Sequence, residues 1–193
     1  MATTLYHIFE DSIYQGNKRA SGDTIVLKFG EDDLESIFIS GGSEGTYTPD
    51  SLGSDIDGKV VYQSDKIKYN MQDESTDLLG EANIDYTDMN LKAGFINVAW
   101  RSNLLKALPS SDKDSTITPF RPTMIEEGNE PMVGDTMIYN LDSQNGKVIR
   151  GKTKADDGYY HGKEIRNQNM DIFYIDDAIY TCLLYTSDAA DDP

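Results

Sequence analysis

Apolar and polar residues alternate along much of this chain, a pattern that is typical of extended strands. In its C-terminal third, Met137, Tyr139 and Leu141 fall on one side of an extended segment, with more polar positions between them. Residues 142–146 are the small and polar residues that a tight turn requires, and residues 147–151 begin the returning strand. This stretch therefore predicts a strand, a turn and a second strand.

One short sequence pattern occurs three times in the chain. A small residue, an aspartate and then apolar residues two apart begin at Gly22, Ser64 and Gly134. Each copy is followed, after a polar turn, by a short apolar run that ends near a glycine: Gly41, Gly80 and Gly151. The spacing of the copies is unequal, so a strict short-period solenoid is excluded. Repeated units that cannot bury a face alone must still stack on their neighbours.

Signals for helices are almost absent. No segment of eleven or more residues combines apolar residues at a spacing of three and four with credible caps. In residues 91–100 the alternation slips by one position at Gly94, which predicts a β-bulge. Residues 170–180 predict a last hairpin that turns at Asp176 and Asp177. The predicted fold class is all-β.

The composition changes once in the middle of the chain. Residues 110–116 are polar and serine-rich, and the prolines at 119, 122 and 131 argue against a place in the middle of a sheet. The last residues, from Cys182 on, lose the repeat pattern and resemble a translated adapter sequence. The predicted organisation is a β unit, a linker or long loop, a second β unit that leads toward a missing barrel, and a non-native tail: 5–108, 109–132, 133–181 and 182–193.

Charge and composition narrow the possible functions. The chain has 193 residues, with 17 basic and 34 acidic side chains and a net charge of −17, which opposes binding of nucleic acid. Its apolar content of 38% lies below the usual value of about 45–50% and suits a thin sheet. The single Cys182 excludes an internal disulfide. Residues 1–6 lack the features of a secretory signal, and we expect that a signal was lost with a missing start.

Residues with catalytic or metal-binding chemistry are sparse. His7 and His161 are the only histidines and are far apart in sequence. The glycine-rich residues 41–45 lack the lysine of a phosphate-binding loop and precede no helix. Acidic clusters at 31–33 and 55–57 do not have the spacing of an EF-hand. We therefore expect no catalytic residue, no metal and no cofactor.

The apolar face is the one functional signal. Its residues would line the inside of a stacked β structure, either as an ordinary core or, if two sheets splay apart, as a groove for acyl chains, in which each buried methylene contributes ~0.8 kcal/mol. The candidates for such a lipid groove are Ile25, Leu27, Phe29, Ile37, Ile39, Ile67, Tyr69, Leu79, Ile84, Leu91, Met137, Tyr139 and Val148.

Several of these stretches resemble a known family. Residues 134–141, 146–153 and 158–165 resemble the periplasmic region of the outer-membrane lipopolysaccharide-assembly proteins of the OstA-like family (LptD). Residues 173–181 look like the segment that leads into the barrel of those proteins, and residues 64–96 are similar to the OstA-like repeat of the transport bridge. The resemblance implies a slotted, V-shaped β-jellyroll (β-taco), built from stacked antiparallel strands, whose interior carries lipid A acyl chains.

The resemblance also implies partners and a location. These are lipopolysaccharide, a periplasmic bridge protein joined by stacking of sheet edges, and an outer-membrane barrel with its lipoprotein plug, in the periplasm and at the outer membrane. The barrel strands and most cysteines of that family are missing, so we expect a fragment. One alternative is a free-standing bridge protein of the LptA type. Another is a β-helical adhesin or a carbohydrate-binding module, which would expose aromatic residues such as Trp100 and Tyr159.

Overall fold

The computed structural model describes residues 7–9, 12–15, 17–31, 33–49, 56, 58–110, 120–155, 158–168 and 172–182. All regular secondary structure in these residues is β, which confirms the predicted class. The strands are β1 (His7–Phe9), β2 (Ser12–Gln15), β3 (Lys18–Ser21), β4 (Thr24–Phe29), β5 (Leu34–Tyr47), β6 (Val60–Asn70), β7 (Ser75–Tyr86), β8 (Met89–Ala99), β9 (Leu104–Leu108), β10 (Thr123–Glu126), β11 (Met132–Val133), β12 (Thr136–Asn140), β13 (Gly146–Ala155), β14 (Gly158–Gln168), β15 (Ile172–Asp176) and β16 (Ile179–Thr181). The predicted tail lies outside the described residues, apart from Cys182.

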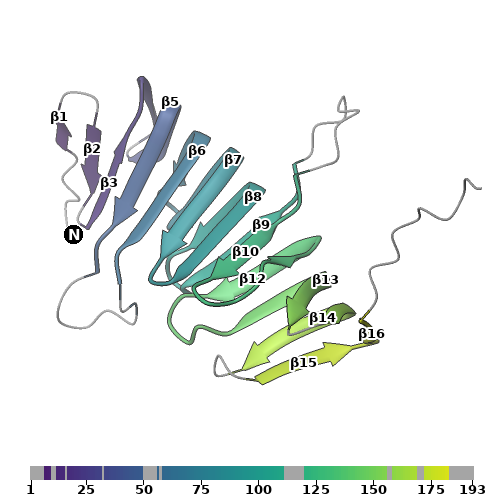
Figure 1. Cartoon of the computed structure of the whole chain (residues 1–193). Helices are drawn as coiled ribbons and strands as arrows, with labels where there is room; N and C mark the ends of the chain where they lie inside the picture. Colours follow the sequence, from purple (N-terminus) through teal and green to yellow (C-terminus); the bar gives the residue numbers. More distant parts are fainter. Residues whose placement is uncertain are drawn as a thin grey trace, which may run out of the picture.

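The described strands form one hydrogen-bonded sheet in which neighbours are antiparallel. The order runs β1-β2-β3-β5-β6-β7-β8-β10-β11-β13-β12-β9, with β4 on β5 and with β14, β15 and β16 on β13. Figure 1 shows these strands stacked along one direction, from β1 in purple to β15 and β16 in yellow. A β-helix consists of parallel strands, so the β-helical alternative is not supported.

A row of bulges crosses the long strands. The register shifts between Ser40 and Ser43 where β5 meets β6, and again at the corresponding points where β6 meets β7 and β7 meets β8. In the last pair, Leu79 lies opposite Phe95 and Ala82 opposite Ala93, which leaves Gly94 at the bulge as the sequence predicts. Bulges bend a strand and increase its twist. The row is therefore a line along which the sheet folds on itself, here called the fold line.

The fold line divides the sheet into two half-sheets. Half-sheet A contains β4, β9, β12, β15 and the segments 34–40, 66–70, 75–79, 95–99, 146–149 and 164–168 of the long strands. Half-sheet B contains β1, β2, β3, β10, β11, β16 and the segments 43–47, 60–64, 82–86, 89–93, 152–155 and 158–161. Pairs of short strands, one on either side of the fold line, thus flank β5, β8, β13 and β14, whereas β6 and β7 lie between long strands.

A pair of tyrosines on β6 shows how sharply the strand bends. Tyr62 and Tyr69 are seven residues apart, which in a straight strand corresponds to about 23 Å. Their phenol oxygens are nevertheless 2.6 Å apart in the interior. The two ends of β6 therefore face each other, and the core lies between the half-sheets.

The repeated aspartate of the sequence marks the fold line. Asp23 donates its backbone N–H to the carbonyl of Gly41 at 2.9 Å, and its side chain lies against that glycine. Asp65 lies against Gly80 in the same way. The two glycines have φ values of 79° and 73°, a left-handed conformation that glycine adopts without steric cost. The repeat therefore encodes the bend.

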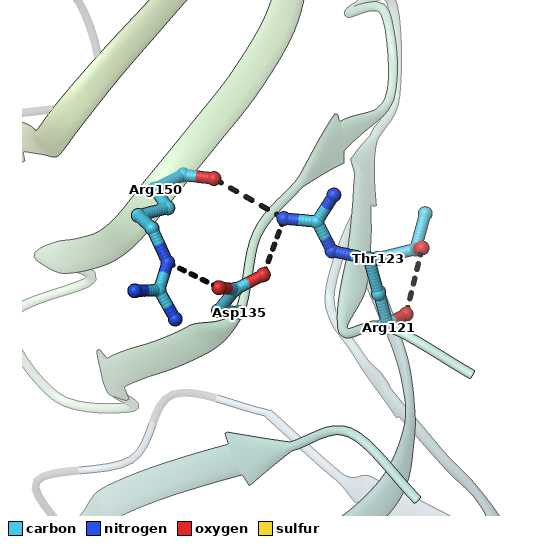
Figure 2. A network of polar contacts seen from close by, with 4 residues as sticks. All are labelled: Arg121, Thr123, Asp135 and Arg150. Carbon is cyan, nitrogen blue, oxygen red and sulfur yellow. Dashed lines mark hydrogen bonds and ion pairs between the residues drawn. The ribbon is translucent and has the colours of Figure 1, made fainter. Parts of the chain in front are cut away.

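In the third copy, two arginines surround the aspartate. Asp135 donates its backbone N–H to the carbonyl of Ile149 at 2.9 Å, and the left-handed position is taken by Arg150, with φ 48°. The Asp135 carboxylate accepts hydrogen bonds from Arg150 Nε and Arg121 Nη2, as Figure 2 shows. Burial alone would raise the pKa of Asp135, but the hydrogen bonds and charges of the two arginines outweigh it, and the net pKa is lowered.

Two details differ from the sequence-based predictions. The proline-rich stretch does contribute to the middle of the sheet: β10 pairs with β8 and β11, because Pro122 and Pro131 precede the strands and leave their ladders intact. The last strands do not form a hairpin. Both β15 and β16 pair with β14, and the chain only steps across the fold line at Asp177, with φ 51°.

The predicted boundary between two β units does not interrupt the sheet. On one side of the fold line β9 pairs with β8 and β12, and on the other β10 pairs with β8 and β11. The ladder is therefore continuous from β8 into the C-terminal strands in both half-sheets. Residues 111–119, the central part of the predicted linker, lie outside the described residues.

Candidate functional site

The interior between the half-sheets is closed along β5 to β8. The side chains that meet there are almost completely buried: Ile37, Ile39, Tyr62, Ile67, Tyr69, Leu78, Ile84, Leu91, Ile96 and Val98. The space bordered by Ile13, Ala20, Ile37 and Tyr69 measures only about 10 Å³, which is room for one water molecule at most. Burial raises the pKa of both Tyr62 and Tyr69, so both phenols are neutral. This part of the interior is a packed core.

An aromatic cluster closes the open side of the V near the N-terminal strands. Trp100, at the free end of half-sheet A, stacks on Tyr47, at the free end of half-sheet B, with ring centroids 4.8 Å apart. The indole N–H donates to Thr76 Oγ1 at 2.7 Å, and Lys18 Nζ lies 4.9 Å from the Trp100 ring centroid. These contacts join the two rims.

A buried hydrogen bond joins the rims further along. Tyr86, at the end of β7 in half-sheet B, donates its hydroxyl to the carbonyl of Leu141, which follows β12 in half-sheet A, at 2.8 Å. Both residues are buried. We call this hydrogen bond the rim clasp. The interior on its N-terminal side is the packed core described above.

Beyond the rim clasp the interior opens into a cavity of about 470 Å³. Met124 and Met132 line it from half-sheet B, and Ile165, Phe173 and Ile175 from half-sheet A. The volume falls in the range of small-molecule sites, about 300–1,000 Å³. Methionine side chains are flexible and polarizable, which suits an irregular apolar ligand.

Polar groups lie at the edge of this cavity. Lys154 Nζ is 3.7 Å from Glu130 Oε1, and Glu126 accepts a hydrogen bond from Asn129 at 3.3 Å. Burial raises the pKa of Glu126, and the nearby Asp88 adds to that effect. The arrangement is an apolar interior with a charged mouth, as an amphiphile requires.

The structure places the thirteen groove candidates unevenly. Eight of them are buried between the half-sheets: Ile37, Ile39, Ile67, Ile84, Leu91, Met137, Tyr139 and Val148. Tyr69 is also buried there, as half of the tyrosine pair. Ile25 and Leu27 are half-buried and pack against this core from the edge strand β4. Whether any of them contacts lipid stays a prediction.

Two candidates do not face the interior. Phe29 is 66% exposed, because the register of β4 and β5 shifts between Lys28 and Phe29 and turns the last side chain outward. Leu79 is 39% exposed, because Leu78 and not Leu79 lies opposite Ile67. Neither can line a groove between the half-sheets.

Sequence reasoning missed most of the cavity. Met124 and Met132 lie within residues 109–132, which the sequence predicts as a linker or long loop, although apolar residues that shortly follow prolines are compatible with short strands. Ile165 and Ile175 alternate with Arg166 and Tyr174 in the final strands, and this alternation was the available signal.

The histidines, possible metal ligands and aromatic residues of the sequence analysis do not form a second site in the described residues. The sheet order separates β1, which carries His7, from β14, which carries His161. Within the described residues no group of three or more histidine, cysteine or acidic side chains could hold a metal ion. Trp100 is only 9% exposed, and Tyr159 is half-buried with Lys152 Nζ 5.4 Å from its ring centroid, so these two residues do not form the flat, exposed aromatic face that the sugar-binding alternative predicts. The described part of the chain contains no helix long and apolar enough to cross a membrane.

The architecture is that of a slotted antiparallel β-jellyroll, and solved structures share it. The chain is similar to the crystal structure of LptH from Pseudomonas aeruginosa, the LptA-homologous periplasmic component of the conserved lipopolysaccharide transport device. The match has a TM-score of 0.53 and 15% identity, and it covers 60% of this chain and 78% of LptH. At that identity the likeness establishes the fold alone. No protein-family model and no curated protein matches the sequence.

Proposed function

We propose that this protein is a non-enzymatic lipid carrier of a lipopolysaccharide transport and assembly machinery in the periplasm. The observation that carries the proposal is the apolar cavity that opens between the half-sheets beyond the rim clasp, in a fold shared with LptH. Acyl chains would lie against Met124, Met132, Ile165 and Ile175, and the phosphates and sugars would stay outside the mouth.

The energetics favour an acyl ligand over a polar one. Each methylene that leaves water for the cavity contributes ~0.8 kcal/mol, so about ten buried methylenes are needed for micromolar affinity, which corresponds to about 8 kcal/mol. An anionic headgroup at the mouth would meet Lys154 but also Glu126 and Glu130, so the acyl chain and not the charge supplies the affinity, and the net charge of −17 disfavours any mode that spreads anionic groups over the whole surface.

The free edge of the sheet supports a second part of the proposal, transfer between proteins. Among the described strands, β15 and β16 pair only with β14, so they form one edge of the described sheet. Large apolar side chains are exposed on them: Ile172, Phe173, Tyr174, Ile179 and Tyr180. Such an edge accepts a strand from another protein. A bridge protein or the periplasmic part of an outer-membrane barrel, as in LptD, would continue the apolar interior across that junction.

The proposal is tested by acyl binding to matched variants. Met132→Gln places an amide in the cavity, whereas Val133→Gln places the same amide on the outer side of β11. Displacement of a fluorescent fatty acid by lipopolysaccharide should weaken on the order of tenfold in the first variant, which corresponds to ~1.4 kcal/mol, and stay unchanged in the second. Equal binding by both folded variants, or no binding by the native protein, would refute the proposal.

A further inference from the structure

A second hollow lies on the other side of the same strands. It measures about 590 Å³ and is lined by residues of β12 to β15 and of the turn before β13. Ile138 and Tyr174 provide its apolar surface, and half of the Tyr174 side chain is exposed. Because Met137 and Ile175 point into the interior, the neighbouring Ile138 and Tyr174 point outward. The hollow is therefore separate from the acyl cavity.

The polar groups of this outer hollow are held in place by carboxylates. Lys147 Nζ lies 2.6 Å from Glu164, and Arg166 lies 3.2 Å from both Glu164 and Asp176. Arg166 and Tyr174 are cross-strand partners, so their side chains lie on the same face of the sheet, and both line the hollow. Donors and acceptors are thus presented side by side in a rigid arrangement.

An amide completes the hollow. The buried Asn167 side chain accepts the backbone N–H of Gly146 and donates to the carbonyl of Gln144 at 3.4 Å. These bonds hold the turn before β13 against β14. The shape of the hollow is therefore set before any ligand arrives, which lowers the entropic cost of binding.

The charge balance decides which ligand fits. The two cations face two carboxylates, so an anion would gain little net attraction and would compete with Glu164 and Asp176. A pyranose has an apolar C–H face that can lie on an aromatic ring and hydroxyl groups that both donate and accept. We propose that the outer hollow binds a neutral hexose-containing saccharide, with one sugar on Tyr174 and its hydroxyls bonded to the lining residues Arg166 and Lys147.

Binding of neutral oligosaccharides to the full chain tests this site independently of acyl binding. Titrations of unbranched glucose and galactose oligosaccharides, followed by NMR, should perturb the amides of β13 to β15. Tyr174→Ala should reduce the affinity at least tenfold and leave fatty-acid binding unchanged. The control Phe38→Ala removes an exposed ring from β5, on the same outer face but outside the hollow, and should keep the native saccharide affinity.

Three results would overturn the assignment. One is a lack of binding for all neutral oligosaccharides tested. The second is native affinity in a folded Tyr174→Ala variant. The third is a hexose phosphate that binds more than tenfold tighter than the neutral sugar, because the charge argument predicts the opposite order. Since fatty-acid binding is measured on the same samples, failure of the saccharide site and failure of the lipid-carrier proposal can be told apart.

Discussion

Removal of the Tyr86 hydroxyl would show whether the rim clasp limits the acyl cavity. The variant Tyr86→Phe keeps the ring that fills the interior and removes only the donor to the Leu141 carbonyl. Because both residues are buried, the loss leaves a carbonyl without this partner in a low-dielectric interior, at a cost of about 1–3 kcal/mol. For a chain of this size, that cost lowers the melting temperature by about 2–12 °C.

The same change should also affect the ligand. Without the clasp, the rims of β7 and of the turn after β12 can separate, and the core side chains next to them can move apart to lengthen the cavity. We therefore expect Tyr86→Phe to bind long acyl chains more tightly than the native protein does, with little change for short chains. Circular dichroism during heating and displacement of fluorescent fatty acids of increasing length measure the two effects.

A matched variant makes the test specific. Tyr174→Phe removes a hydroxyl from an exposed ring and should change the free energy of unfolding by less than about 0.5 kcal/mol. If Tyr86→Phe behaves like this control in both melting temperature and chain-length preference, the clasp does not hold the rims together, and the reasoning is wrong.

Three further changes probe the fold line and the charged groups. Gly80→Ala should destabilise the protein more than Gly42→Ala, by more than about 1 kcal/mol in denaturant unfolding: both glycines have positive φ, but only at Gly80 would a Cβ collide with Asp65. Glu126→Gln should have a higher free energy of unfolding than the native protein at pH 7, and the difference should disappear at pH 3. Burial raises the folded-state pKa of Glu126, so the native protein loses stability as the pH rises above the unfolded value of about 4.3. Asp135→Asn should show the reverse dependence: the lowered pKa of Asp135 stabilises the native protein at neutral pH, and this advantage over the variant should disappear as the pH falls toward the folded-state pKa.

Local patterns were sufficient to predict the strands and the bend. The aspartate of each repeat, the glycine that follows it and the slip at Gly94 are encoded within a few residues, and all of them lie on the fold line. The strand, turn and strand of residues 136–155 follow from alternation and turn residues in the same way.

Features that depend on distant pairing were not predictable. Either Leu78 or Leu79 could face inward, and only the register with β6 decides between them. The position of β10 in the sheet was likewise not predictable, because it is set by the pairing with β8 and not by a pattern within residues 123–126. An apolar face also looks the same whether it is a groove or a core. Here the large side chains of Tyr62, Tyr69 and Trp100 fill the N-terminal interior, and the cavity of about 470 Å³ lies near the C-terminal strands.

The position of a bound acyl chain can be determined on the native protein with a photoreactive fatty acyl probe, followed by mass spectrometry of the labelled peptides. We expect labels on β10, β11, β14 and β15, at residues that face the interior, such as Met124, Met132 and Ile165. Labels concentrated at Ile67 or Ile84 would mean that the packed core opens for lipid. Labels only on outward residues such as Ile125, or none at all, would mean that no acyl chain enters between the half-sheets.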